Sequence, residues 1–382
     1  MKKGDIMAFK VLTIVGTRPE LIKLSKIIPE LDKAVDHILV HTGQNHAYEL
    51  CEIFFNDLGI RKPDYFLNAV GSSVVNTIGA ILKKTDVVMK QEKPDALLLL
   101  GDTNSCLCAI AAKKRRIPIF HMEAGNRCFD ERVPEEINRK IIDHISDINL
   151  PYTDHAQKYL LAEGLKPQTV IKTGSPMKEV LDSHMPKILE SKILTHLKLN
   201  KEGYFIVSIH REENVDSSKS LSLLLKSFEQ IVTHYKKPII VSTHPRTAKQ
   251  LKKQPKKINS LIRFESPFGF FDYVRLQKDA FCVLSDSGSL TEEASILNFP
   301  AVMLREAHER PEGMDEASVM MGGLSEQRII DAIDLTRRHY QSKDRCFRIP
   351  SDYDVDNVSK KVVRIILSYT DYVNRFVWHK NI

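Results

Sequence analysis

The sequence predicts an α/β protein with two doubly wound domains, and three observations support this fold class. Short apolar runs alternate with longer amphipathic segments, which is the pattern of βα units around parallel sheets. The alternation stops at TGSPMKEVL (173–181) and then begins again. With 382 residues, 42% of them hydrophobic, the chain is long enough for two separate cores. We therefore expect a first domain over residues 1–175 and a second over 176–369.

Apolar runs place the strands of the first half. They predict strands at 11–16, 37–42, 96–102, 118–123 and 148–153. Amphipathic segments between the runs predict helices at 19–31, 46–57, 74–91, 104–116 and 134–146. Pro134 stands at the first position of the last of these helices, which suits the fixed φ of proline. The first half thus alternates strand and helix, as a parallel sheet requires.

The second half repeats the pattern and ends in a helix. Its predicted strands are 204–210, 238–244, 280–286 and 300–304. The tail is predicted helical over 358–380, and its apolar residues follow the spacing of one helix face: Tyr369, Tyr372, Val373, Phe376 and Val377. Because this face needs a partner, we expect the final helix, 370–382, to pack back on the first domain.

Composition excludes several classes of protein. The net charge of +7 arises from 56 basic and 49 acidic residues spread along the chain, which argues against a nucleic-acid surface. The six cysteines show no repeated C-x-x-C pattern, so we expect free thiols in a reducing compartment. No apolar stretch approaches the ~18 residues of a membrane span, and no charged-then-apolar signal segment is evident. We therefore expect a cytoplasmic protein without membrane contact.

Polar and charged residues follow most of the predicted strands at their carboxyl ends. They are residues 16–18, 42–44, 101–102, 121–123, 210–211, 244–246 and 286–289. In open α/β sheets, ligands bind outside this edge. The sequence therefore predicts that both sheets present functional groups at their carboxyl edges.

The segment LSDSGSLTEEAS (284–295) predicts an anion site. Ser287, Gly288 and Ser289 precede a helix, where backbone N–H groups and the helix dipole favour phosphate oxygens. Glu293, one turn into the helix, could accept ribose hydroxyls. An ordinary capped helix would use the same residue types, so this alternative stays open. Two cations in the first domain, Arg18 and Lys23, would complement a diphosphate.

Three carboxylates of the first domain suggest acid–base chemistry. Asp102 and Glu123 end predicted strands, and Glu135 opens a helix on which Asn138 and Arg139 share its face. Burial and mutual repulsion can raise the pKa of such groups into a useful range. Salt bridges or helix capping could equally explain Asp102 or Glu135 alone.

Two strand-end histidines are less informative. His210 and His244 could be hydrogen-bonded structural residues, or could in principle hold a metal with other histidines. The chain contains no H-E-x-x-H motif, which argues against the metal.

Nine separated blocks resemble, in order and spacing, the motifs of the non-hydrolysing UDP-N-acetylglucosamine 2-epimerases. The blocks are GTRPELIKL, HTGQNH, GDTNSCLCAIAA, HMEAGNR with VPEEINR, TGSP, SIHREEN, STHPRT, DSGSLTEEA and REAHERPEG, and the resemblance runs from about residue 9 to residue 325. The resemblance implies the GT-B architecture, two Rossmann-like domains around a central cleft, usually in a homodimer. It also implies elimination of UDP to a 2-acetamidoglucal and re-addition on the other face of C2, with no metal, nicotinamide or other cofactor.

The resemblance assigns roles to individual residues. The catalytic positions are Asp102, Glu123, Glu135 and His210. The positions that bind the UDP-N-acetylhexosamine substrate are Arg18, Lys23, Arg139, His244, Ser287, Gly288, Ser289, Glu293 and Arg310. The product of such an enzyme, UDP-N-acetylmannosamine, is a precursor of surface polysaccharides.

Some stretches depart from the family pattern and leave alternatives open. NHAYELCE (45–52), NAVGSS (68–73) and HREE (210–213) lack the arginine and glutamines of members that their own substrate activates. These features and the tail look closer to a capsule-pathway branch that makes UDP-N-acetyl-L-fucosamine from the 6-deoxy-L-talo sugar. A GT-B glycosyltransferase and a hydrolysing relative are further alternatives.

Overall fold

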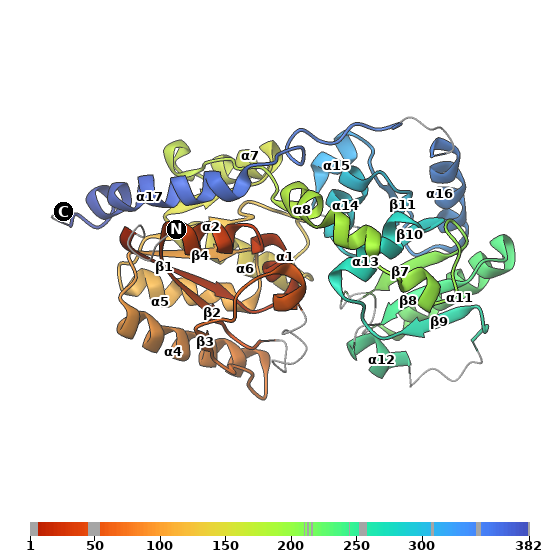
Figure 1. Cartoon of the computed structure of the whole chain (residues 1–382), viewed down its shortest axis with the longest axis horizontal. Coiled ribbons are helices and arrows are strands. Elements are labelled where there is room, and N and C mark those ends of the chain that lie inside the picture. Colours follow the sequence, from red (N-terminus) through yellow and green to blue (C-terminus); the bar gives the residue numbers. More distant parts are fainter. Residues whose placement is uncertain are drawn as a thin grey trace. The chain divides into compact units, whose positions relative to one another are not determined.

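The computed structural model describes residues 7–44, 54–209, 211, 214, 217–243, 245–251, 258–306, 309–340 and 345–380. The chain forms two compact units (Figure 1). The first unit comprises Met1–Asp182 and Asp352–Ile382, and the second comprises Ser183–Ser351. Each unit contains one six-stranded sheet with helices around it, so the predicted α/β fold class is confirmed.

The unit limits differ from the predicted domain limits in two places. Residues 176–182 and 352–369, predicted in the second domain, belong to the first unit. Hydrogen bonds explain the difference. Ser175 N donates to the carbonyl oxygen of Asp352 at 2.8 Å, and Ser359 N donates to Glu179 Oε2 at 3.0 Å. These bonds tie the returning chain to the first unit.

The sheet of the first unit is parallel throughout. Its strand order is β3-β2-β1-β4-β5-β6. The strands are β1 (Met7–Val15), β2 (Val35–His41), β3 (Tyr65–Phe66), β4 (Ala96–Leu100), β5 (Ile119–Met122) and β6 (Ile148–Leu150). This order reverses direction between β1 and β4, which is the topological switch point where such folds bind ligands. The carboxyl ends of β1, β4 and β5 therefore meet at one edge.

The second sheet repeats this topology. Its order is β12-β11-β10-β7-β8-β9, with every pair parallel. The strands are β7 (Phe205–Ile209), β8 (Ile239–Thr243), β9 (Ile262–Glu265), β10 (Cys282–Ser285), β11 (Ala301–Met303) and β12 (Met320–Met321). The switch point lies between β7 and β10, so the loop after β10 stands at the expected ligand edge.

Helices of the first unit cover both faces of its sheet. They are α1 (Arg18–Leu24), α2 (Ile27–Ala34), α4 (Val74–Glu92), η1 (Asn104–Cys108), α5 (Ala109–Lys114), α6 (Pro134–Ile145), α7 (Asp154–Ala162), η2 (Pro167–Thr169) and α17 (Val358–Phe376). The predicted helix 19–31 is in fact two helices, and the predicted helix 104–116 begins as a 3₁₀ turn. Most of the predicted helix 46–57 lies outside the described residues.

The second unit has its own helices and its own core. Helix α8 (Met177–Glu190) leads into it, followed by α9 (Ile193–His196), α11 (Ser218–Tyr235), α12 (Pro245–Leu251), α13 (Phe270–Lys278), α14 (Ser289–Leu297), α15 (Pro311–Asp315) and α16 (Glu326–His339). Buried strand residues such as Val207 and Val241 pack against Phe228 of α11 and Ile333 of α16. None of the helices in the described residues is long and apolar enough to cross a bilayer.

The last helix packs on the first unit through a different face from the one predicted. Helix α17 lies against α2 (Figure 1). Its buried residues are Val358, Ser359, Val362, Val363, Ile366, Thr370 and Val373. Of the predicted apolar face only Val373 is buried, whereas Phe376 is 62% exposed and Val377 is 41% exposed. The predicted aromatic stripe was therefore wrong as a buried face, because smaller aliphatic residues one turn earlier make the contact.

Candidate active site

The loop between β1 and α1 is held by a buried carboxylate. Glu20 Oε2 accepts hydrogen bonds from Gly16 N and Thr17 N, both at 2.6 Å, so the chain turns directly into α1. A Cβ on Gly16 would lie 1.9 Å from Ser105 Oγ, so only glycine fits there. This turn presents Arg18 at the first position of α1, with its guanidinium 5.3 Å from the centre of the Phe54 ring.

Glu20 also connects this loop to the loop after β4. Its Oε1 accepts a hydrogen bond from Thr103 Oγ1 at 2.7 Å, and Thr103 directly follows Asp102. Burial raises the pKa of Glu20, although its hydrogen bonds to Gly16, Thr17 and Thr103 act in the opposite direction. Two strand-end loops therefore share one buried carboxyl group.

The next loop, after β5, carries Glu123. Its backbone has φ +62°, a left-handed conformation that is unusual for a residue with a side chain. Lys23 Nζ donates to both carboxylate oxygens of Glu123, at 2.7 and 2.6 Å, and lies 5.8 Å from the Tyr152 ring centre. The pair is largely buried, with side-chain exposures of 8% for Lys23 and 13% for Glu123. The structure thus brings together two residues for which the sequence analysis predicted separate roles.

Helix α6 holds Asp102 from the other side. Arg139 Nε donates to Asp102 Oδ2 at 2.7 Å, and Asn138 Nδ2 donates to the backbone carbonyl of Asp102 at 2.9 Å. Asn138 and Arg139 reach the same target, as expected from their shared helix face. Glu135 stands in the first turn of the same helix and is half-buried. Asp102 itself keeps 27% side-chain exposure, so a ligand can reach it.

Sequence reasoning missed Glu136, the neighbour of Glu135. Glu136 is fully buried and accepts hydrogen bonds from Arg139 NH1 at 2.7 Å and from Cys128 N at 3.2 Å. Burial favours its neutral form, but these hydrogen bonds and the Arg139 charge hold the pKa of Glu136 below its ordinary value. Its i, i+3 spacing to Arg139 was the available signal. Glu136 orients Arg139 toward Asp102.

In the second unit, the loop after β10 forms a compact turn at the start of α14. Gly288 is the N-cap, and the hydroxyls of Ser287 and Ser289 lie 3.1 Å apart. A Cβ on Gly288 would lie 2.3 Å from Glu309 Oε1. Glu309 is itself clamped, because Arg305 NH1 donates to its Oε2 at 2.7 Å. The close approach requires glycine at this position.

Further predicted residues of the second unit surround this turn. Glu293 is 9% exposed and accepts a 2.6 Å hydrogen bond from Gln277 Nε2. Arg310 is 2% exposed and forms an ion pair with Glu292 at 3.3 Å. The two histidines assigned to the site, His210 and His244, lie outside the described residues.

The carboxyl edges of the two sheets thus carry different groups. In the first unit, Asp102, Glu123, Lys23 and Arg139 lie at the switch point between β1 and β4 or directly beside it. The second unit presents small residues at the amino end of α14. Within the described part of the chain, no group of three or more histidine, cysteine or acidic side chains could hold a metal ion.

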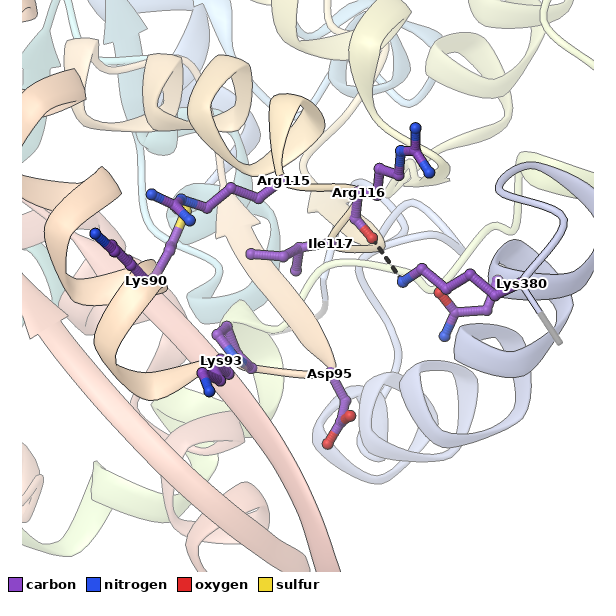
Figure 2. Close-up of a pocket in the computed structure, with 10 residues that line it drawn as sticks. Lys90, Lys93, Asp95, Arg115, Arg116, Ile117 and Lys380 are labelled. Carbon is purple, nitrogen blue, oxygen red and sulfur yellow. Dashed lines mark hydrogen bonds between the residues drawn. The ribbon is translucent and has the colours of Figure 1, made fainter. Parts of the chain in front are cut away.

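A basic pocket lies at the opposite edge of the first sheet (Figure 2). It has a volume of about 320 Å³, and its basic lining residues are Lys90, Lys93, Arg115, Arg116 and Lys380. The first four stand at the carboxyl ends of α4 and α5, where cations complement the helix dipole. Lys380 donates to the carbonyl of Arg116 at 2.9 Å, as Figure 2 shows. These cations cap helices. The pocket lies at the amino ends of the strands, whereas the candidate site lies at their carboxyl ends.

The fold and the site together define the class of the protein. Two Rossmann-like units with the same strand order, each with functional groups at its switch point, are the units of a GT-B protein. The profile of the UDP-N-acetylglucosamine 2-epimerase family matches residues 29–367, and the chain therefore belongs to this family.

Individual relatives agree with this assignment. A UDP-N-acetylglucosamine 2-epimerase of Methanococcus maripaludis is 38% identical over 347 residues, which cover 87% of this chain and 94% of the relative. The solved structure of a UDP-N-acetylglucosamine 2-epimerase from Rickettsia bellii is 54% identical with a TM-score of 0.92, over 98% of this chain and all of that chain. The Methanocaldococcus jannaschii enzyme, solved in complex with UDP-GlcNAc and UDP, is 33% identical with a TM-score of 0.87, over 94% and 100%.

Proposed function

We propose that the protein epimerises UDP-N-acetylglucosamine at C2 to give UDP-N-acetylmannosamine. The observation that carries the proposal is the pair of carboxylates at the first switch point, Glu123 held by Lys23 and Asp102 held by Arg139. The chain's family and the likeness to an enzyme solved with UDP-GlcNAc and UDP support the choice of substrate.

The proposed reaction has two balanced halves. A carboxylate removes the proton from C2 while the bond from C1 to the diphosphate oxygen breaks, which gives 2-acetamidoglucal and UDP. UDP then adds back to C1 while a carboxyl group returns a proton to the opposite face of C2. The two faces need two proton carriers, and the oxocarbenium-like intermediate needs a stabilising negative charge. We assign Asp102, Glu123 and Glu135 together to these roles. His210 is assigned to assist the departure of UDP.

The second unit supplies the nucleotide site in this proposal. The small residues Ser287, Gly288 and Ser289 at the start of α14 leave room for a diphosphate at a helix amino end. We assign Glu293 to the ribose hydroxyls, and the remaining predicted binding residues to the UDP-sugar: Arg18, Lys23, Arg139, His244 and Arg310. The site, as proposed, uses no cofactor.

Deuterium exchange at C2 tests the proposed reaction. When the protein is incubated with UDP-N-acetylglucosamine in D2O without an acceptor, deuterium should appear at C2 of the sugar while the nucleotide sugar stays intact. NMR follows both. Release of free sugar would indicate a hydrolase, and turnover only with an added acceptor would indicate a glycosyltransferase. Exchange with the 6-deoxy-L-talo substrate alone would favour the UDP-N-acetyl-L-fucosamine branch.

A pair of variants makes this experiment specific. Glu123→Gln should slow exchange by roughly 100-fold to 10,000-fold, the range expected for loss of an acid–base group. Glu92→Gln is the matched control, because Glu92 also pairs with a lysine, Lys10 at 3.0 Å, but away from the carboxyl edge. Exchange by Glu123→Gln at the rate of Glu92→Gln would refute the acid–base assignment.

We also infer that the protein is a homodimer. The start of α4 exposes apolar side chains, with Val74 64% and Val75 76% exposed, and Val87 on the same helix is 58% exposed. Burial of such a surface by a second copy would be favourable. Light scattering should give twice the mass of the chain, and Val75→Lys should shift it toward the monomer. The proposed cytoplasmic location rests on the sequence pattern, and the proposed role in surface-polysaccharide synthesis rests on the family resemblance.

A further inference from the structure

A cluster of four charged residues, three of them buried, lies directly beneath the site loops of the first unit. We call it the buried ion cluster, and it consists of His121, Arg127, Asp143 and Glu163. The first three side chains are at most 1% exposed. Arg127 NH1 donates to Asp143 Oδ2 at 2.7 Å, and Arg127 also donates to both oxygens of Glu163 at 2.8 and 2.6 Å. The proposed reaction makes no use of these residues.

The surroundings of His121 place an acceptor oxygen near each of its ring nitrogens. Nε2 lies 2.8 Å from the carbonyl oxygen of Gly101, which can only accept a hydrogen bond, so Nε2 carries a proton. Nδ1 lies 3.0 Å from Asp143 Oδ1, which is the distance of an ion pair, although the two atoms lack the geometry of a hydrogen bond. A hydrogen bond from Arg127 helps to keep Asp143 ionised, and its pKa is lowered although burial acts the other way. A lone pair on Nδ1 would face this carboxylate, so the contacts favour the imidazolium form of His121.

The balance of charged groups around His121 favours its protonated state. Burial lowers the pKa of His121, but Asp143, the Gly101 carbonyl and the nearby charge of Asp102 together raise it. Arg127 is the opposing cation, and it is balanced by Glu163 on its other side. The pKa of His121 is therefore raised above that of an ordinary histidine.

The cluster is connected to both loops that carry candidate catalytic carboxylates. His121 binds the carbonyl of Gly101, the residue directly before Asp102. Asp143 accepts from Gly125 N at 3.2 Å, two residues after Glu123. Gly101 and Gly125 both have left-handed backbones, with φ +79° and +82°, which leave these loops dependent on such bonds for their shape.

We propose that His121 and Asp143 are positioning residues that fix the loops of Asp102 and Glu123 relative to each other. This inference rests on the proposed function, because it assigns the two residues to the geometry of C2 proton exchange. The pair joins β5 to α6 and reaches the loops after β4 and β5, so one buried ion pair sets the separation of two carboxylates. Small displacements of reacting groups have large effects on rate.

An ordinary buried ion pair is the competing explanation, and the first unit contains a matched example. His37 Nδ1 lies 2.6 Å from Asp32 Oδ1, and its Nε2 lies 2.8 Å from Thr13 Oγ1. The His37 side chain is fully buried, but His37 lies near the start of β2, away from the site loops. His37→Gln therefore measures what the loss of a buried histidine–aspartate pair does to stability alone.

Kinetics of the full-length protein compare the two histidines. We expect His121→Gln to lower kcat for C2 exchange on the order of 100-fold, with KM for UDP-N-acetylglucosamine changed less than about threefold. His37→Gln should shift the midpoint of urea unfolding by about as much as His121→Gln does, but it should keep the wild-type kcat. Equal kcat values for the two variants would overturn the proposal.

The Asp143→Asn variant adds a readout that a purely structural role would not move. Without the carboxylate, His121 should lose its proton nearer the ordinary histidine pKa of about 6.5. The alkaline limb of its kcat–pH profile should therefore shift to lower pH than in the wild type. An unchanged limb would contradict the inference.

NMR of the histidine ring nitrogens separates this inference from the proposed function. In the wild type, both His121 nitrogens should remain protonated well above about pH 6.5. If the wild type showed no C2 exchange, the proposed function would fail while this protonation could still be observed. If the wild type does exchange the C2 proton of its substrate but His121 loses a ring proton near neutral pH, the positioning role is overturned.

Discussion

At the scale of single residues, the left-handed backbone of Glu123 is the most informative feature of the site. A residue with a side chain costs about 1–3 kcal/mol in such a conformation, and it persists only where the surroundings hold it. Lys23 binds both carboxylate oxygens, and Asp143 anchors Gly125 two residues later. The strained backbone therefore holds the carboxylate of Glu123 in a single position at the edge of the sheet.

The first prediction concerns the lysine of this pair. Lys23→Met keeps the length of the side chain but removes both charge-assisted hydrogen bonds to Glu123. We expect C2 exchange to fall on the order of 100-fold, because the carboxylate loses its fixed position. Lys10→Met is the control, since Lys10 pairs with Glu92 at 3.0 Å outside the site. A rate for Lys23→Met equal to that of the control would show that the pair is only structural.

The second prediction concerns the stability contribution of Glu20. Its folded-state pKa is raised by burial, so its stabilising contribution is complete below the unfolded pKa of about 4.3 and is lost as pH rises through the folded value. Glu20→Gln removes this loss and keeps an acceptor for Gly16 N and Thr17 N. Urea unfolding should show Glu20→Gln gaining stability relative to the wild type as the pH rises above about 4.3, the unfolded pKa.

Glu20→Ala supplies the comparison for this experiment. It leaves the buried N–H groups of Gly16 and Thr17 without their acceptor, at a cost of about 2 kcal/mol near neutral pH. A Glu20→Gln variant that lost as much stability as Glu20→Ala would show that the ionised carboxylate is required.

The sequence predicted which residues reach the sheet edges, but not all of their partners. Motif positions and strand ends identified Asp102, Glu123 and Lys23, because parallel strands bring their carboxyl ends together. The Lys23–Glu123 pair spans 100 residues, and no local pattern reports a contact of that separation. Asp143 was missed for the same reason, since it lies on the interior face of α6.

At the scale of elements, the break between α1 and α2 shows where periodicity misleads. Apolar spacing predicted one helix over 19–31, but Ser25 ends α1 and its hydroxyl donates to the Ile22 carbonyl at 2.7 Å. Pro29 has no N–H to bond to the carbonyl of Ser25, so one continuous helix could not pass this point. The first turn of α2 tolerates this proline, so a new helix begins there instead. The strands β3, β9 and β12 were missed; β3 and β12 have only two residues each, which show no alternation.

The third prediction concerns the turn at the start of α14. Gly288→Ala would place a methyl group 2.3 Å from Glu309 Oε1, and the arginines that clamp Glu309 leave it little room to move. Displacing this carboxylate should distort the turn and weaken UDP binding about tenfold or more, as measured by calorimetry. Gly79→Ala is the control, because a Cβ there meets open space. Unchanged UDP affinity in Gly288→Ala would separate this turn from the nucleotide site.

At the scale of the whole molecule, the chain repeats one topology and then returns to its first unit. The formation of one α/β unit by each half was predictable, because each half of the sequence alternates strand and helix signals around a pause near residue 175. The return of the last helix to the first unit was also predicted, but its start at Asp352 was not. The hydrogen bonds of Asp352 to Ser175 and Lys172 join residues nearly half the chain apart, and no local pattern predicts them. The periodicity of the last helix shows that one face is apolar, but it does not show which residues contact another element.

The fourth prediction follows from the separate cores of the two units. Ile366 of α17 is fully buried in the first unit, and Ile333 of α16 is fully buried in the core of the second. Truncation of either to alanine should lower the free energy of unfolding by about 2–5 kcal/mol.

Hydrogen exchange by mass spectrometry should show Ile366→Ala losing protection in segments of residues 7–182, while segments of 183–351 stay protected. Ile333→Ala should give the reverse. Because the two substitutions remove the same atoms, they control for each other. Equal loss in both units from either variant would mean that the units unfold as one.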